Sequence, residues 1–163
     1  MSARLAELHA IRSLLARAGE VVSHGWVQGG WFTLATPGGE VMVTAHDLQL
    51  AKDHPVTGAC LVGAIVHAAG GPEVARTQLV QRTLDLTWHA LREDLERPPV
   101  LCPSPPVRTV RLLDLTRWND APGRTQGEVL DLLGAARHLA DVHGEAYRAE
   151  RQAVSRDEPV ASA

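Results

Sequence analysis

The chain has little of several residue types, and each shortage excludes a class of protein. Lys52 is its single lysine, and 16 basic residues stand against 19 acidic ones, for a net charge of −3. A protein without an excess of positive charge has no broad field to attract nucleic acid. We therefore expect no nucleic-acid partner.

Long apolar runs and cysteines are also scarce. No apolar stretch approaches the roughly 18 residues of a membrane span, and the opening MSARLAELHAIRSLL carries charges throughout, unlike a signal peptide. Cys60 and Cys102 are the only cysteines, and in a reducing cytosol they are expected to be thiols. The sequence thus predicts a cytoplasmic protein without a membrane partner.

The length of 163 residues is that of one domain with its own core. Regular hydrophobic spacing stops near residue 150, so we predict a single globular domain over 1–150 and a frayed tail over 151–163.

Helices and one hairpin account for the first half of the chain. Apolar residues at spacings of three and four predict a helix over Ala3–Ser23. Two alternating segments, Trp31–Thr36 and Glu40–Thr44, flank Pro37-Gly38-Gly39 and predict a β-hairpin. Thr57 is expected to cap a helix that ends near Ala69, whose many Gly and Ala residues allow close approach by another element.

The second half is predicted to be helical around one proline-rich loop. Pro72 suits the first turn of a helix that ends before Pro98, with an inward stripe of Val80, Leu84, Trp88, Leu91 and Leu95. Pro98–Pro106 is expected to be an extended loop. A helix from Ser104 is favoured, with Val107, Val110, Leu113 and Trp118 inward, although the alternation of Val110 and Leu112 leaves a strand open.

The last predicted helix has the clearest start signal. Thr125 and Glu128 form a capping box, and apolar residues at helical spacing continue to His143. The expected fold is α+β and mainly α, a compact helical domain of four to five helices with one two-stranded β-hairpin.

The stretch WNDAPGRT, residues 118–125, joins two predicted helices and has two interpretations. It is either a polar turn in which every residue has a local role, or one wall of a binding site. In the second case Trp118, Asn119, Asp120 and Arg124 meet a polar segment from elsewhere in the chain.

Three ordered motifs carry a resemblance to a known family. They are GWVQG at residues 25–29, CLVGAI at 60–65, and WND at 118–120 followed by Arg124-Thr125 and Glu128-Val129. With them the chain, over about Leu5 to Ala140, resembles an uncharacterised family of small actinobacterial and actinophage proteins. The preference for Arg over Lys agrees with such a source. The resemblance implies a single domain whose motif residues meet in space, and it implies no reaction.

Cys60 is the one candidate nucleophile. A cysteine in the first turn of a helix has a lowered thiol pKa, which favours the reactive thiolate. A cysteine enzyme also needs a general base beside the thiol. His67 lies two turns further along the same predicted helix, about 10 Å away, which is too far for a hydrogen bond to Cys60. Asp120 is the other candidate catalytic residue, and a small buried cysteine in a tight helix contact is the alternative.

Neither a cofactor nor a metal is predicted. The sequence has no phosphate loop or dinucleotide fingerprint, and His46-Asp47 and Asp53-His54 lack the spacing of a known zinc pattern. His138 and Asp141 lie one helical turn apart and could ligate an ion, but a helix-surface pair is the commoner explanation. Trp26 and Trp31 flank Gln28 and either cover the hairpin or line a groove.

Our leading hypothesis is a binding or regulatory module that recognises a partner protein or small ligand. Its candidate binding residues are Trp26, Gln28, Trp118, Asn119, Asp120 and Arg124. One alternative is a hydrolase or transferase that uses Cys60 as nucleophile. In a second, the motifs are structural and function lies on the hairpin and the proline-rich loop.

Overall fold

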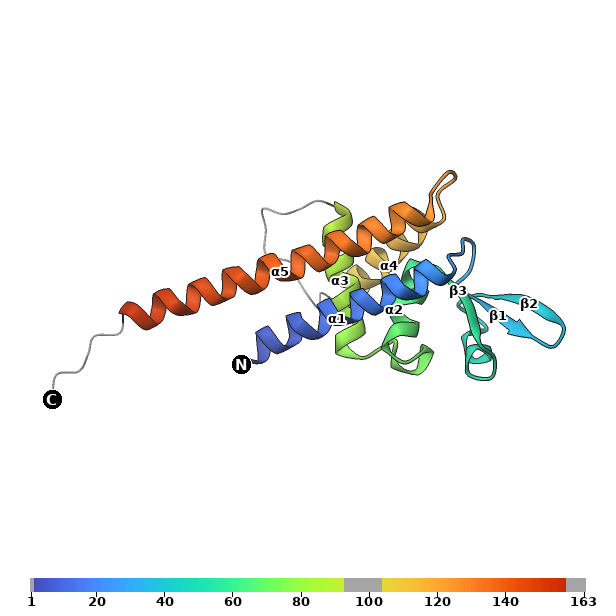
Figure 1. The fold of residues 1–163 in the computed structure, drawn as a ribbon, viewed down its shortest axis with the longest axis horizontal. Coiled ribbons are helices and arrows are strands. Elements are labelled where there is room, and N and C mark those ends of the chain that lie inside the picture. The colour runs from blue at the N-terminus through green and yellow to red at the C-terminus, as the bar shows by residue number, and fades with distance from the viewer. Residues whose placement is uncertain (1, 93–103, 158–163) are drawn as a thin grey trace.

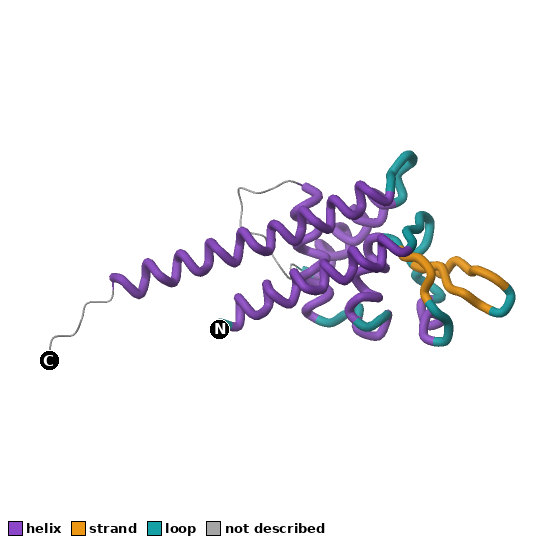
Figure 2. Tube along the Cα trace, in the orientation of Figure 1, coloured by secondary structure: helices purple, strands orange, loops and turns teal. Residues whose placement is uncertain are grey.

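The computed structural model describes residues 2–92 and 104–157, which form a mainly helical α+β fold (Figure 1). Five α-helices pack together, and a small sheet lies at one end of the bundle (Figure 2). The helices are α1 (Ala3–His24), α2 (Leu61–Ala69), α3 (Gln78–Arg92), α4 (Pro105–Asn119) and α5 (Gln126–Asp157). The predicted fold class is therefore confirmed.

The sheet has three strands, so the predicted two-stranded hairpin is incomplete. Strands β1 (Phe32–Thr36) and β2 (Gly39–Val43) form the expected hairpin, and β3 (Val56–Ala59) pairs antiparallel with the other side of β1. The segment that we expected to start a helix at Thr57 is β3. Four residues, one of them glycine, carry too weak a strand signal, and pairing with the distant β1 decides their conformation.

The local signals for the hairpin turn and for the start of α5 are confirmed. Gly39 takes a φ of 113°, which a residue without a side chain adopts readily. The Oγ of Ser2 accepts from the Leu5 N–H at the start of α1. In the capping box, Thr125 N–H donates to Glu128 at 2.8 Å and Glu128 N–H donates to the Thr125 hydroxyl at 3.2 Å.

The core lies where α1 packs against α5, α2 and α3. The inward stripe of α1 has six buried residues at spacings of three, four and one: Leu8, Ile11, Leu14, Leu15, Ala18 and Val22. Helix α2 is buried over Leu61–Val66 and is therefore the central element. Its short side chains let the start of β1 pass close, as expected, since Gly63 lies against the Trp31 backbone.

Helix α3 begins later than predicted. Pro72 opens a separate 3-10 turn, η2 (Pro72–Val74), and a further turn, η1 (Leu48–Lys52), lies beside the hairpin. Val80 and Leu84 are buried as expected, and Trp88 and Leu91 are half-buried. Leu95, and most of the predicted loop up to residue 103, lie outside the described residues.

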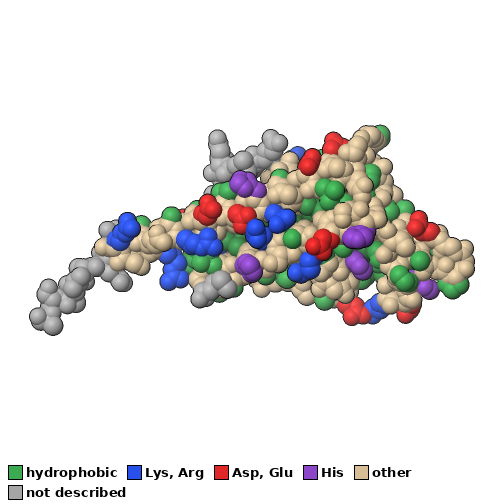
Figure 3. All heavy atoms as spheres, in the orientation of Figure 1, with side chains coloured by type: hydrophobic (Ala, Val, Ile, Leu, Met, Phe, Trp, Pro, Cys, Tyr) green, Lys and Arg blue, Asp and Glu red, His purple; other side chains and the backbone are tan. Residues whose placement is uncertain are grey.

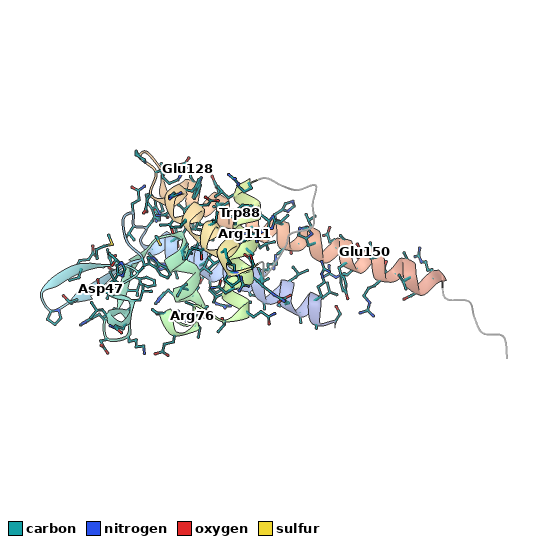
Figure 4. The ribbon with its side chains drawn as sticks, turned by 180° about the vertical axis from the view of Figure 1, so that it is seen from behind. Asp47, Arg76, Trp88, Arg111, Glu128 and Glu150 are labelled. Atoms are coloured by element: carbon teal, nitrogen blue, oxygen red, sulfur yellow. The ribbon has the colours of Figure 1, made fainter. Side chains whose placement is uncertain are left out.

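Helix α4 is a helix as favoured, but of the four residues predicted to face inward only Trp118 packs against the core. Val107, Val110 and Leu113 are 42%, 56% and 45% exposed, whereas Arg111, Leu115 and Asn119 are buried. An ion pair decides the orientation, because Arg111 meets the buried Asp85 of α3 at 3.0 Å. The Arg111 guanidinium also lies 4.5 Å from the centre of the Trp88 ring (Figure 4).

Helix α5 runs beyond the domain that we predicted. It continues to Asp157, past the predicted boundary at residue 150, and extends away from the bundle (Figure 1). Its residues from 148 to 156 are all exposed, so packing ends near Tyr147 although the helix does not. Residues 158–163 of the predicted tail lie outside the described part. Among the described helices, none is both long and apolar enough to cross a membrane.

Candidate functional site

The three sequence motifs meet around the buried side chain of Asn119. Its Oδ1 accepts from the indole N–H of Trp26 at 2.9 Å and from the Leu61 N–H at 3.0 Å. Its amide nitrogen donates to the Val27 carbonyl at 3.1 Å and to Asp120 at 2.8 Å. All four hydrogen-bonding positions of the amide are thus used inside the protein.

Gln28 and Asp120 close the same cluster from opposite sides. Gln28 Nε2 donates to the carbonyls of Asn119 and Ala121, at 2.9 and 3.0 Å. Asp120 Oδ1 accepts from the Gly29 N–H at 3.1 Å. We call Trp26, Gln28, Asn119 and Asp120 the motif cluster. It ties the loop after α1 to the end of α4.

Arg124 and Trp118 form the other half of the corner. The Arg124 guanidinium lies 4.0 Å from the Trp118 ring centre, and its Nε donates to the Trp118 carbonyl at 2.9 Å. Arg124 also pairs with Glu128 at 3.0 Å. The Thr125 N–H, its hydroxyl and Arg124 hold the pKa of the Glu128 carboxyl below its ordinary value. These contacts fix the turn that leads into α5.

The structure therefore brings all the predicted binding residues to one corner, where their polar atoms bond mainly to each other and to the backbone. Asn119 is 1% exposed, and only Gln28 and Asp120 are largely exposed. A buried amide whose bonds are all satisfied stabilises a fold and has no donor or acceptor left for a ligand. The contacts of Asn119 and Asp120 are therefore not local: these residues meet Trp26, Gly29 and Leu61 from elsewhere in the chain, as the second interpretation expected, and the bonds serve the fold.

Cys60 lies beside this cluster but lacks the properties of a nucleophile. It is the N-cap residue of α2, and its Sγ accepts from the Gly63 N–H at 3.2 Å. Burial raises the pKa of the thiol to about 11, more than the backbone N–H groups lower it, and the Asp120 charge raises it further. We expected the helix terminus to lower this pKa, and the loss of hydration outweighs that effect.

His67, which lies on the helix that Cys60 caps, packs against the sheet. His67 lies edge-on to Phe32, with ring centres 6.1 Å apart, and burial lowers the pKa of its imidazole. Asp141, a possible partner of His138, instead pairs with Arg12 at 2.9 Å. Within the residues that the structure describes, no three His, Cys, Asp or Glu side chains are grouped to hold a metal ion.

Two hollows combine residues that the sequence did not group together. His24 and His67 line one of about 440 Å³ between α1, β3 and α2. Arg4, Gln78, Arg82 and His143 line another of about 590 Å³ between α1, α3 and α5. Only the packing of helices distant in sequence brings these groups together, so no local motif could reveal them. Basic, acidic and histidine side chains are mixed over the α1 and α5 face (Figure 3).

Comparison with known proteins identifies the family. No curated protein and no solved structure is significantly similar to the chain. A model described as "Family of unknown function (DUF6197)" matches residues 6–139. That range contains α2 to α4, the sheet, the motif cluster, and most of α1 and of the packed part of α5. The chain therefore belongs to DUF6197, a family of unknown function.

Proposed function

We propose that the protein is a cytosolic protein-binding module whose partner lies on the outer face of α4. We define this face by Val107, Val110, Leu113 and Arg117. The observation that carries the proposal is the outward position of an apolar stripe that a helix normally buries.

The exposed stripe offers binding energy that the fold leaves unused. Val107, Val110 and Leu113 are each more than 40% exposed and follow one another at a spacing of three, on one side of the helix. Full burial of such a side chain is worth about 1.5–3 kcal/mol. A partner that covers all three therefore gains several kcal/mol, and apolar patches of this kind mark interaction surfaces.

Positive charge at the edge of the stripe indicates that the partner carries acidic residues. Arg117 continues the face one turn beyond Leu113 and is exposed, whereas Arg108 lies toward the buried Asp85, 3.9 Å away. We therefore expect an amphipathic helix with acidic residues beside its apolar side chains.

The face is held rigidly, which favours binding. Arg111 anchors the middle of α4 to Asp85, and Asn119 anchors its end through the motif cluster. A surface that is already ordered loses little conformational entropy when a partner binds. The motif residues thus support the site without touching the partner.

The alternative of a cysteine enzyme receives no such support. A thiol that is 3% exposed, with a pKa of about 11, is protonated at neutral pH and out of reach of a substrate.

The test is a pair of charge substitutions on this face, Val110→Glu and Leu113→Glu. Both positions are exposed, so the substitutions should leave the melting temperature within a few degrees of the wild type. We expect the immobilised wild-type chain to retain a protein from cell extract, and either variant to reduce the retained amount at least tenfold.

Val154→Glu is the matched control, because Val154 is 67% exposed on the distal part of α5. It should retain the partner fully. Retention that survives both α4 substitutions contradicts the proposal. A wild-type dimer in solution that Val110→Glu dissociates also contradicts it, because the face would then join two copies of the chain.

A further inference from the structure

The hollow between α1, α3 and α5 is a second candidate binding region, separate from the α4 face. Its volume of about 590 Å³ is within the range of small-molecule pockets, and it opens to solvent. Four of its lining side chains carry or accept charge, namely Arg4, Glu7, Arg82 and His143. They come from three helices that are packed in a fixed arrangement.

The charges in this hollow do not cancel. Glu7 forms an ion pair with Arg82, and both side chains are about one-quarter exposed, at 25% and 26%. With its amide oxygen turned toward Arg82, Gln78 accepts from that guanidinium at 2.6 Å. Arg4 is held over the Tyr147 ring, 5.2 Å from its centre, and adds one positive charge that Glu7 does not balance.

His143 supplies the group that lacks a partner. Its Nε2 is buried, and none of the described residues hydrogen-bonds to it. Burial, and then the charge of Arg4, lower the pKa of the imidazole, so the ring is neutral at pH 7. A buried polar group without a protein partner calls for another one, such as an ion, and the net positive charge of the hollow favours an anion.

We propose that this hollow binds a small acidic molecule, with its carboxylate or phosphate group between the Arg4 guanidinium and the His143 ring. The inference goes beyond the α4 surface, since it concerns another face and another class of ligand. Arg82 positions the wall of the hollow, because Glu7 and Gln78 already engage its guanidinium.

Binding of this ligand is coupled to protonation of His143. The charged groups that line the hollow around the ring are Arg4 and Glu7 from α1 and Arg82 from α3. A bound anion offsets the field of Arg4 and favours the imidazolium, so it raises the pKa of His143. By linkage, the ligand binds more tightly as the pH falls through that pKa.

Proton NMR of the full chain tests the proposal. The His143 ring signal is assigned from its loss in His143→Gln, and its pKa is measured in chloride, acetate and phosphate at equal ionic strength. We expect phosphate or acetate to raise the pKa by about half a unit or more. A shift with phosphate alone identifies a phosphorylated ligand class, and a shift with acetate identifies carboxylates.

Arg4→Gln should abolish the rise in the His143 pKa that phosphate or acetate causes. The matched control is Arg12→Gln, which removes the same charge from the same helix and breaks the exposed pair with Asp141. The Arg12→Gln variant should keep the rise in the His143 pKa. An unchanged His143 pKa in both anions overturns the proposal, as does a shift that persists in Arg4→Gln.

Discussion

Asn119 is the residue on which the arrangement of the corner most depends. Its amide combines two acceptor and two donor positions, and the structure uses them for Trp26, Leu61, Val27 and Asp120. Neither a carboxylate nor an apolar side chain of that size satisfies both kinds of partner. The sequence indicated the polar cluster, and only the contacts across more than 50 residues assigned its role.

Cys60 provides a residue-scale prediction with a defined pH dependence. Its pKa is raised from 9.0 to about 11 in the folded chain, so folding opposes formation of the thiolate. The contribution of the protonated Cys60 thiol to folding stability is fully present below pH 9 and is lost as the pH rises toward 11. We expect the free energy of unfolding to fall by up to about 3 kcal/mol over that window, measured by urea denaturation.

Cys60→Ser is the control for this loss, since it keeps a capping side chain and does not titrate in the window. The variant should lose less stability than the wild type between pH 9 and 11. Equal losses would show that other groups cause the fall. Rapid alkylation of Cys60 in the native chain at pH 7, relative to the unfolded chain, would contradict its burial and restore the enzyme hypothesis.

At the scale of elements, two errors of the sequence interpretation have one cause. Strand β3 and the orientation of α4 both depend on partners that lie far away in the chain, namely β1 and Asp85. The apolar spacing in α4 is real, and it faces outward because the buried ion pair and Asn119 determine the inward side. Periodicity reports which face is apolar and does not report which partner that face meets.

The close contact of α2 with the start of β1 gives an element-scale prediction. A Cβ at Gly63 would lie 2.3 Å from the Trp31 carbonyl oxygen, and backbone must shift to accept it. Gly63→Ala should therefore lower the free energy of unfolding by about 1–3 kcal/mol, measured by urea denaturation.

Gly134→Ala is the matched substitution in a helix without such a contact. Nothing lies within 4 Å of a Cβ at that position in α5. Alanine has the higher helix propensity, so this variant should be more stable than the wild type by up to about 1 kcal/mol. A similar effect of both substitutions would mean that α2 and β1 are not closely packed.

At the scale of the whole molecule, α5 stays helical well beyond the part that packs against the other helices. Residues 148–156 are exposed, and the helix continues through them (Figure 4, Glu150). A chain that stops after Tyr147 should keep its free energy of unfolding within about 0.5 kcal/mol. The measurement is urea denaturation followed by circular dichroism at 222 nm.

A second truncation, after Arg137, makes the comparison informative. It removes Leu139 and Ala140, which are 4% and 2% exposed, and should lower stability by several kcal/mol. If the shorter deletion cost as much, the distal part of α5 would have a stabilising role that its exposure does not indicate.

Local signals along the chain determined much of this protein. Hydrophobic spacing located α1 and its buried face, Pro37-Gly38-Gly39 located the hairpin, and Thr125 with Glu128 located the start of α5. These features depend on interactions within a few residues, so a single sequence contains them. The same local reading brought attention to the residues of the motif cluster.

The tertiary structure decided what those residues do. It made β3 a third strand, turned the apolar side of α4 outward, buried Cys60 and used the polar atoms of the motif cluster within the fold. It also assembled Arg4, Arg82 and His143 around one hollow. Each of these outcomes depends on residues far apart in the chain, whose approach is set by the packing of the whole core rather than by any local pattern.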